Sequence, residues 1–261
     1  MDAIPIGVLF AATIIIVVIT IEAGYRLGHA VHRRSAGEKE SSVSAITAAI
    51  LGLVAFMLAF TFGIVTNRYD ARKALVLEEA NAIGTAYLRS DFLPEKDRGE
   101  AAGLFREYVD YRLASAKWRD LTQLQKALVE SDRIQRRLWE MAVANARKDM
   151  NSDVAALYID ALNHVIDIHA SRVAVALQAR VPGGIWLVLY VLIVLGMIGV
   201  GYQTAIAGSA RRSRATPILA VAFSLVIVLI ASPDRPHGRF ITVSQQPLAD
   251  LRASMSDGRG Q

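Results

Sequence analysis

The chain has 261 residues, of which 53% are apolar, and its formal net charge at pH 7 is +5. This apolar content is high for a soluble domain and indicates a membrane protein with basic loops. Cysteine is absent, which excludes disulfides and cysteine-based metal or catalytic sites. The basic residues form no stripe interleaved with aromatic residues, so we expect no nucleic-acid partner.

Four runs without a charged residue predict membrane-spanning helices, because about 20 apolar residues cross roughly 30 Å of hydrocarbon. These runs are 4–21, 45–66, 182–210 and 216–232. The first run lacks the basic N-terminal region of a signal peptide, so we interpret it as a retained helix. The lipid bilayer is therefore the first predicted partner of the chain.

The polar segment 67–181 predicts a helical domain outside the membrane. Apolar residues recur at helical spacing after Pro94, from Leu121 to Met141, and again after Ser152, which can cap a helix. No β pattern occurs in this segment. The predicted fold class is all-α, an integral membrane protein with four transmembrane helices and a helical extramembrane domain.

The predicted order of domains follows from these segments. Residues 1–66 hold transmembrane helices 1 and 2, residues 67–181 the helical domain, residues 182–232 transmembrane helices 3 and 4, and residues 233–261 a C-terminal tail. Within the tail, a brief alternation over 241–244 suggests an extended segment that docks on the helical domain.

The second apolar run continues into a charged segment with no helix breaker before Pro94, which predicts one long helix. A set of aromatic and polar residues falls within roughly 60° of one direction on this helix. This set, the front face, contains Phe56, Phe60, Asn67, Glu78, Asn81 and Thr85. The opposite direction, the back face, collects Leu58, Val65, Tyr69, Val76, Ile83 and Tyr87.

Two interpretations of the front face stay open. In a ring of identical subunits, Phe56 and Phe60 would form a hydrophobic constriction, and the polar residues beyond them would line a wet vestibule. These six front-face residues are therefore our pore-lining candidates. Alternatively, the polar residues face bulk water, and the two phenylalanines face lipid or neighbouring helices.

Small residues predict close helix packing on the first two membrane helices. A ridge on the second helix consists of Ala48, Gly52, Ala55, Ala59 and Gly63, and Gly24 and Gly28 repeat the pattern on the first. Such residues let helix backbones approach each other in lipid. The contacts can lie within one subunit or between subunits.

Other charged residues suggest pairing and solvation rather than chemistry. Glu22 and Arg26, four positions apart, predict an interfacial ion pair. Asp160, His164 and Asp167 share a helix face, which we interpret as a solvated polar face because the Glu-x-x-His pairs of di-iron bundles are missing. No nucleophile elbow, phosphate-binding loop or zinc motif occurs. We therefore expect no metal, no cofactor and no enzyme activity.

The side of the membrane that carries the helical domain stays open. Basic residues gather in the two short loops, at Arg26, Arg33, Arg34, Lys39, Arg211, Arg212 and Arg214. The positive-inside rule places these loops in the cytoplasm and the domain outside. Arg68, Arg72 and Lys73, at the other end of the second helix, weaken this bias.

Three segments resemble the bacterial bestrophin-like membrane proteins, a domain family without an assigned activity. They are Glu-Ala-Gly-Tyr-Arg-Leu-Gly at 22–28, the stretch 67–89 with Glu-Glu-Ala-Asn-Ala-Ile-Gly-Thr-Ala as its most specific part, and Asp-Arg-Pro-His-Gly-Arg-Phe at 234–240. The resemblance extends over nearly the whole chain. It implies a multi-pass protein of the bacterial inner membrane.

The resemblance also implies a function. Bestrophins are pentameric anion channels whose second membrane helix lines the pore around a hydrophobic neck, so the resemblance implies a homo-oligomeric channel for small ions with Phe56 and Phe60 at its neck. Asp70 and Glu78 depart from this pattern, because acidic rings favour cations. The alternative function is a non-conducting membrane sensor or scaffold that binds a partner through its helical domain.

Overall fold

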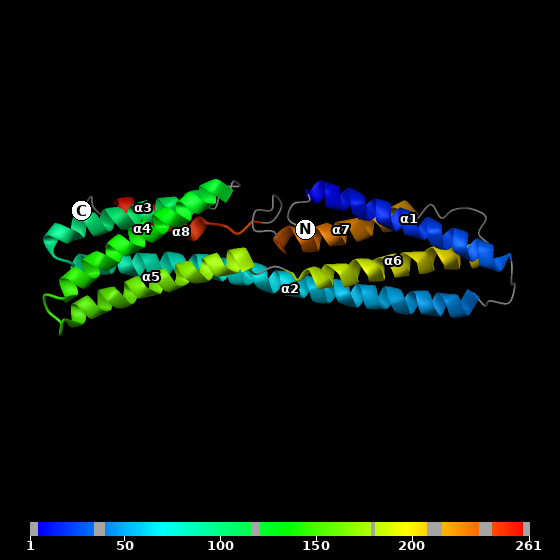
Figure 1. Cartoon of the computed structure of the whole chain (residues 1–261), viewed down its shortest axis with the longest axis horizontal. Helices are drawn as coiled ribbons and strands as arrows, with labels where there is room; N and C mark the ends of the chain where they lie inside the picture. Colours follow the sequence, from blue (N-terminus) through cyan, green and yellow to red (C-terminus); the bar gives the residue numbers. More distant parts are fainter. Residues whose placement is uncertain are drawn as a thin grey trace. The chain divides into compact units, whose positions relative to one another are not determined.

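The computed structural model of the chain describes residues 5–33, 40–115, 121–178, 181–207, 216–234 and 242–257. These residues form helices and connecting turns without a β-strand, which confirms the all-α prediction (Figure 1). In chain order the elements are α1 (Ile6–His32), α2 (Glu40–Arg89), the 3-10 helix η1 (Ser90–Phe92), α3 (Glu95–Ser115), α4 (Leu121–Ala146), α5 (Asp153–Gln178), α6 (Gly183–Ile206), α7 (Thr216–Asp234) and α8 (Gln246–Asp257).

The helix boundaries follow the breakers in the sequence. α2 runs without a break from Glu40 to Arg89, and α3 begins directly after Pro94, whose carbonyl oxygen accepts the backbone N–H of Asp97 at 2.8 Å. Ser152 caps α5, since its Oγ accepts the backbone N–H of Ala155 at 3.2 Å. Local sequence signals therefore account for where α3 and α5 start.

The chain forms two compact units. The first contains residues 1–69 and 180–242, and the second contains residues 70–179 and 243–261. Helix α2 contributes residues 40–69 to the first unit and residues 70–89 to the second. The basic loop residues Arg34, Lys39, Arg211, Arg212 and Arg214 lie outside the described part of the chain, as does 235–241.

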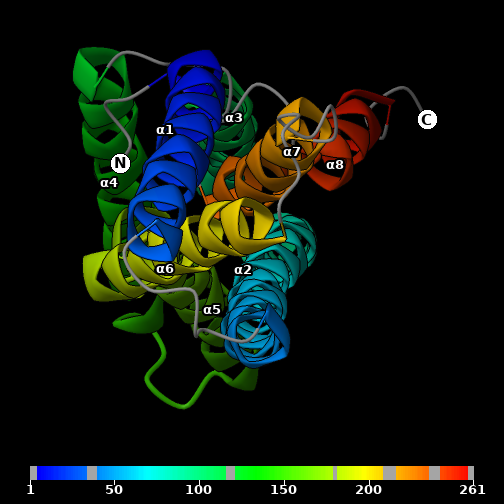
Figure 2. The same ribbon diagram turned by 90° about the vertical axis from the view of Figure 1, so that its right-hand side faces the viewer.

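Among the described residues, four helices are long and apolar enough to cross a membrane, namely α1, α2, α6 and α7. They agree with the four predicted spans. α6 packs on α1 and on α2, and α7 packs on α1 (Figure 2). Side-chain hydrogen bonds also connect helices of the first unit. For example, the hydroxyl oxygens of Thr13 and Tyr190 lie 3.0 Å apart.

Glycines set the spacing between α1 and α6. A Cβ added to Gly24 would lie 2.8 Å from the Cα of Ile198, and one added to Gly201 would lie 2.8 Å from the backbone nitrogen of Tyr25. Real Cβ atoms essentially never come this close to the backbone atoms of another helix. The two helices therefore touch through their backbones, as small residues permit in lipid.

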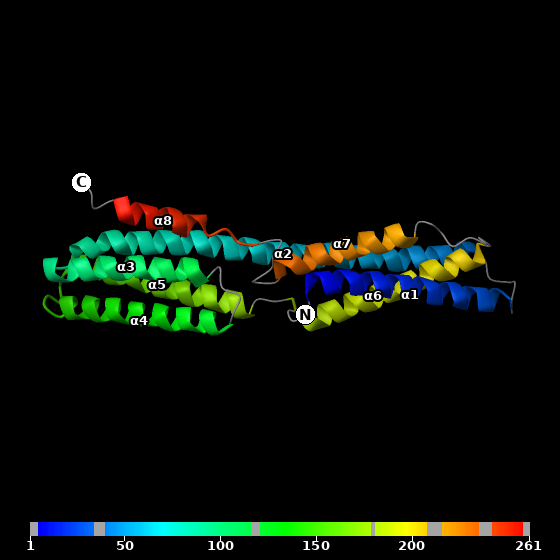
Figure 3. The ribbon, with the colours of Figure 1, turned by 90° about the horizontal axis from the view of Figure 1, so that it is seen from above.

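The second unit is a helical bundle made of residues 70–89 of α2 together with α3, α4, α5 and α8. Its core contains large buried side chains from four of these helices, including Ile83, Phe105, Leu138 and Leu162. Within the predicted tail 233–261, residues 246–257 form α8. α8 lies alongside α2 (Figure 3), where a Cβ added to Gly84 would be 3.2 Å from Leu251.

Replacing Gly24 with alanine should destabilise the packing of α1 on α6, because the new methyl group forces the two backbones apart. We expect the free energy of unfolding to fall by about 1–3 kcal/mol, measured by denaturant titration of the solubilised chain. Gly7→Ala is the matched control in the same helix, since nothing lies within 4 Å of a Cβ added there. Equal effects of the two substitutions would contradict this account.

Candidate functional site

The membrane part of the α2 front face is uncovered in the chain. The side chains of Phe56 and Phe60 are 64% and 56% exposed, and their rings stack with centroids 6.4 Å apart. The ridge of small residues beside them is exposed too, at Ala48, Gly52, Ala55, Ala59 and Gly63. A Cβ added to Gly52 or Gly63 would meet nothing within 4 Å. Both sets of residues therefore remain available for contacts outside the chain.

The polar part of the front face is exposed as well. Asn67 lies at the end of the first unit, and Glu78, Asn81 and Thr85 belong to the second, each with an exposed side chain. The back face is covered, with Val65, Val76 and Ile83 buried. Leu58, Tyr69 and Tyr87 on the same side are half-buried. Each unit thus buries the back of α2 and leaves its front to the surroundings.

The remaining candidate residues lie apart from this face. Gly24 and Gly28 contact α6, where a Cβ added to Gly28 would be 2.9 Å from the Cβ of Ala205. The Nε of Arg26 donates to Glu22 at 2.8 Å within α1. Gly24 and Gly28 thus pack α1 on α6, whereas Glu22 and Arg26 pair within α1.

The candidate metal face carries exposed side chains at Asp160, His164 and Asp167. Asp160 accepts a long hydrogen bond of 3.4 Å from Arg89. Among the residues that the structure describes, no group of three or more acidic or histidine side chains could hold a metal ion.

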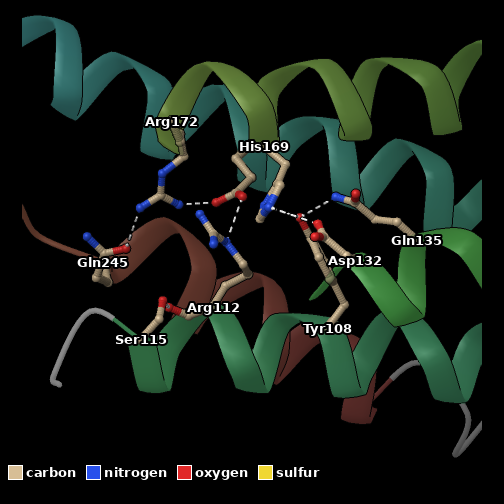
Figure 4. Close-up of polar contacts among 9 residues, drawn as sticks. Tyr108, Arg112, Ser115, Asp132, Gln135, His169, Arg172 and Gln245 are labelled. Atoms are coloured by element: carbon tan, nitrogen blue, oxygen red, sulfur yellow. Dashed lines mark hydrogen bonds and ion pairs between the residues drawn. The ribbon is translucent and has the colours of Figure 1, made fainter. Parts of the chain in front are cut away.

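A buried ionic cluster in the second unit was not predicted from the sequence. Glu79 of α2 is 0% exposed, and its two carboxylate oxygens accept hydrogen bonds from different helices (Figure 4). Oε1 accepts from Nε of Arg112 on α3 at 2.9 Å, and Oε2 accepts from Nη1 of Arg172 on α5. Arg172 also donates to the side chain of Gln245, just before α8, at 3.3 Å. One carboxylate therefore joins three helices.

A chain of neutral polar groups continues from this cluster (Figure 4). The hydroxyl oxygen of Tyr108 accepts a hydrogen bond from Nε2 of Gln135 at 3.0 Å and lies 3.1 Å from Nδ1 of His169. Since burial raises the pKa of Tyr108, its hydroxyl keeps its proton and can donate it to Nδ1. The other ring nitrogen of His169 then carries a proton toward Asp132, 3.8 Å away.

Burial and the nearby Arg112 guanidinium lower the pKa of His169 to about 4. The imidazole is therefore neutral at pH 7, which suits its place beside two arginines. Burial also lowers the pKa of Arg172 below its ordinary value, although the Glu79 carboxylate opposes this shift. Burial thus disfavours positive charge at both side chains, and the nearby Arg112 adds to this effect.

A signal for this cluster exists in the sequence. Glu79 interrupts the apolar stripe that runs from Val76 to Ile83, and Arg112 follows Tyr108 on the buried side of α3. A charged residue within an apolar stripe must be paired, because isolated buried charges are too costly. The stripe therefore indicates a buried ion pair, but it does not identify the partners.

Comparisons with known proteins agree with this architecture. The family model of the Bestrophin-like domain matches residues 7–248. The chain belongs to the Bestrophin-like family. No curated protein matches this bestrophin-like chain.

Solved structures share the fold of this bestrophin-like protein. Crystal structures of a bacterial bestrophin homologue from Klebsiella pneumoniae include a variant with a TM-score of 0.66 at 15% identity, which covers 98% of this chain and 99% of that chain. The homologue solved by Zn-SAD phasing gives 0.64 at 16% identity, with coverage of 98% and 99%. Another crystal structure, of a variant described as a membrane protein, gives 0.58 at 15% identity over 98% and 99%. At these low sequence identities, the structural similarity shows a shared fold alone.

Glu79→Gln should destabilise the bestrophin-like chain strongly, because it leaves two arginines without their buried carboxylate. We expect the free energy of unfolding to fall by about 3–5 kcal/mol, as for other broken buried pairs. Its neighbour Glu78 is exposed, so Glu78→Gln should change stability by less than about 0.5 kcal/mol. Denaturant titration of both variants measures the difference, and a small effect at Glu79 would contradict the structural role of the cluster.

His169 should make the stability of the chain fall in mild acid. The folded state binds a proton here only near pH 4, whereas an unfolded histidine does so near its ordinary pKa of about 6.5. The unfolded state therefore holds more protons between these values, and the stabilisation is lost as the pH falls from about 6.5 to 4. The loss amounts to about 3 kcal/mol.

Denaturant titrations at several pH values test this assignment. His169→Gln should flatten the dependence of unfolding free energy on pH in that window. The exposed His164 on the same helix provides the control, since His164→Gln makes the same substitution outside the buried cluster. An unaltered slope in the His169 variant would show that other groups cause it.

Proposed function

We propose that the chain forms a homo-oligomeric ion channel of the bacterial inner membrane, in which α2 of each subunit lines a central pore. Phe56 and Phe60 form its hydrophobic neck, and Asn67, Glu78, Asn81 and Thr85 line its polar part. Membership of the Bestrophin-like family supports this proposal, because bestrophins are ion channels. The observation that carries it is the uncovered front face of α2.

The composition of this face favours a protein contact over a lipid contact. Most exposed side chains of α6 and α7 are large and aliphatic, for example Leu187, Val191 and Leu225, as expected of helices in hydrocarbon. α2 instead exposes a ridge of alanine and glycine, which lipid contact does not require. Such residues characterise helix interfaces in membranes, and nothing in the described chain covers them.

The ridge and the pore-lining candidates occupy neighbouring directions on α2. At about 100° per residue, the mean direction of the ridge lies roughly 75° from that of Phe56, Phe60 and the polar residues. In a ring of helices, the side that touches a neighbour lies next to the side that faces the axis. The same helix can therefore pack on the next subunit through its ridge and present its aromatic and polar residues to the pore.

Conductance of the purified chain in planar bilayers tests the proposal. We expect single-channel currents, and we expect Phe56→Ala and Phe60→Ala to increase them because they widen a hydrophobic constriction. Phe62→Ala is the matched control, since Phe62 is exposed in the same membrane segment but lies away from the front face. Glu78→Gln should shift the reversal potential in a salt gradient toward anion permeation, because it removes a ring of negative charge.

Two results would overturn the proposal. The first is the absence of current in every salt and at every voltage, with the Phe56→Ala and Phe60→Ala variants equally silent. The second is a particle without a central axis flanked by α2, which electron microscopy of the solubilised protein would reveal. Either result would favour a non-conducting membrane module.

A further inference from the structure

The buried cluster of the second unit contains one more positive charge than negative charge. Glu79 provides a single carboxylate, while Arg112 and Arg172 each provide a guanidinium. The side chain of Arg112 is 6% exposed and that of Arg172 is 16% exposed. Isolated charges are costly at such sites, so buried charges are normally compensated by a counter-ion. The single carboxylate of Glu79 balances one of the two positive charges, and it cannot balance the other.

Among the residues that the structure describes, the other groups around the cluster do not supply the missing negative charge. Tyr108 and His169 are neutral at pH 7, because burial raises the pKa of the phenol and lowers that of the imidazole. Gln135 and Gln245 carry no charge. The carboxylate of Asp132 is 61% exposed and faces the far nitrogen of His169, so it lies in water at the other end of the polar chain.

The two guanidinium groups also retain hydrogen-bonding capacity. Each guanidinium carries five N–H donors. Within the described residues, Arg112 donates through Nε alone, and Arg172 donates through its two terminal nitrogens to Glu79 and Gln245. Figure 4 shows the terminal nitrogens of Arg112 pointing toward the side on which Arg172 lies. Unused donors of Arg112 therefore lie on the side of Arg172, whose side chain is partly exposed.

We propose that this cluster binds one small monovalent anion, chloride under cellular conditions, held by Arg112 and Arg172 beside Gln245. A single negative charge completes the charge balance of the cluster, and the limited exposure of both arginines favours an ion of small size. Charge-assisted hydrogen bonds from guanidinium groups supply the binding energy. The site lies on the buried side of α2, whereas the proposed pore uses its exposed front, so the anion is bound as a structural ligand and not as a permeating ion.

Thermal unfolding of the solubilised full chain in different sodium salts of equal ionic strength tests the proposal. A ligand that binds only the folded state raises the midpoint of unfolding. We expect chloride and bromide to raise the midpoint above that in gluconate by about 3 °C or more, because gluconate is too bulky for the cluster. Equal midpoints in chloride, bromide and gluconate would overturn the proposal.

A substitution that adds the missing charge separates specific binding from general salt effects. In Gln245→Glu, the new carboxylate can accept the hydrogen bond from Arg172 and balance the cluster. This variant should unfold in gluconate at the temperature at which the native chain unfolds in chloride, and it should no longer respond to chloride. A chloride response that persists in this variant would overturn the proposal.

The control is Gln125→Glu, which makes the same chemical change at an exposed position of α4. It should keep the full chloride response. Anomalous diffraction from crystals grown in bromide locates the ion, and we expect a peak within hydrogen-bonding distance of both arginines. Bromide peaks confined to other places would contradict the site. None of these readouts depends on ion conduction, so this proposal and the channel proposal can fail separately.

Discussion

The buried carboxylate of Glu79 is the contact on which the geometry of the second unit depends. Hydrophobic packing holds helices together without fixing their register, because it has no preferred direction. Glu79 instead requires donors at defined positions on α3 and on α5. If one of these helices slid by a turn, a charge would be left unpaired in the interior, at a cost of several kcal/mol, on the order of the whole stability of a domain. The ionic cluster thus fixes a register that apolar side chains alone would leave loose.

This constraint acts on the helix that also crosses the membrane. α2 buries Val65 in the first unit and Val76 and Ile83 in the second unit. Glu79 lies on the same buried side of the helix. A helix that leaves the hydrocarbon needs support in water, since isolated helices of this kind are marginal. The back of α2 obtains this support from the bundle. Within each unit, the front of the helix keeps its side chains exposed.

The sequence predicted those features that depend on neighbouring residues. Apolar runs located four membrane helices, the absence of a breaker before Pro94 predicted the uninterrupted α2, and Ser152 marked the start of α5. The two faces of α2 also followed from periodicity alone. α8 was missed, although Leu248, Leu251 and Met255 have helical spacing, because the prolines and polar residues before it suggested a tail.

The partners of Glu79 in the ionic cluster could not be predicted from the sequence, for a different reason. Arg112 lies 33 positions from Glu79, and Arg172 lies 93 positions from it. Nothing local pairs these residues with one another in a chain rich in charged side chains. An apolar stripe that contains a glutamate shows that partners must exist, but the fold is needed to identify them. Gly24 and Gly201 are similar, since small residues indicate a close approach and only the structure shows which helices approach.

The exposed front of α2 and its buried back place different constraints on the amino-acid sequence. Residues on the back, and those of the ionic cluster, determine whether a subunit folds, so few substitutions there can persist. Residues such as Phe56, Phe60 and Thr85 contribute little to the folding of the single chain, because their side chains are exposed. In the proposed channel, substitutions at these positions act on the contact between subunits and on the ions that pass along this face. If the proposal holds, the residues that line the pore can therefore change step by step while the subunit retains its stability.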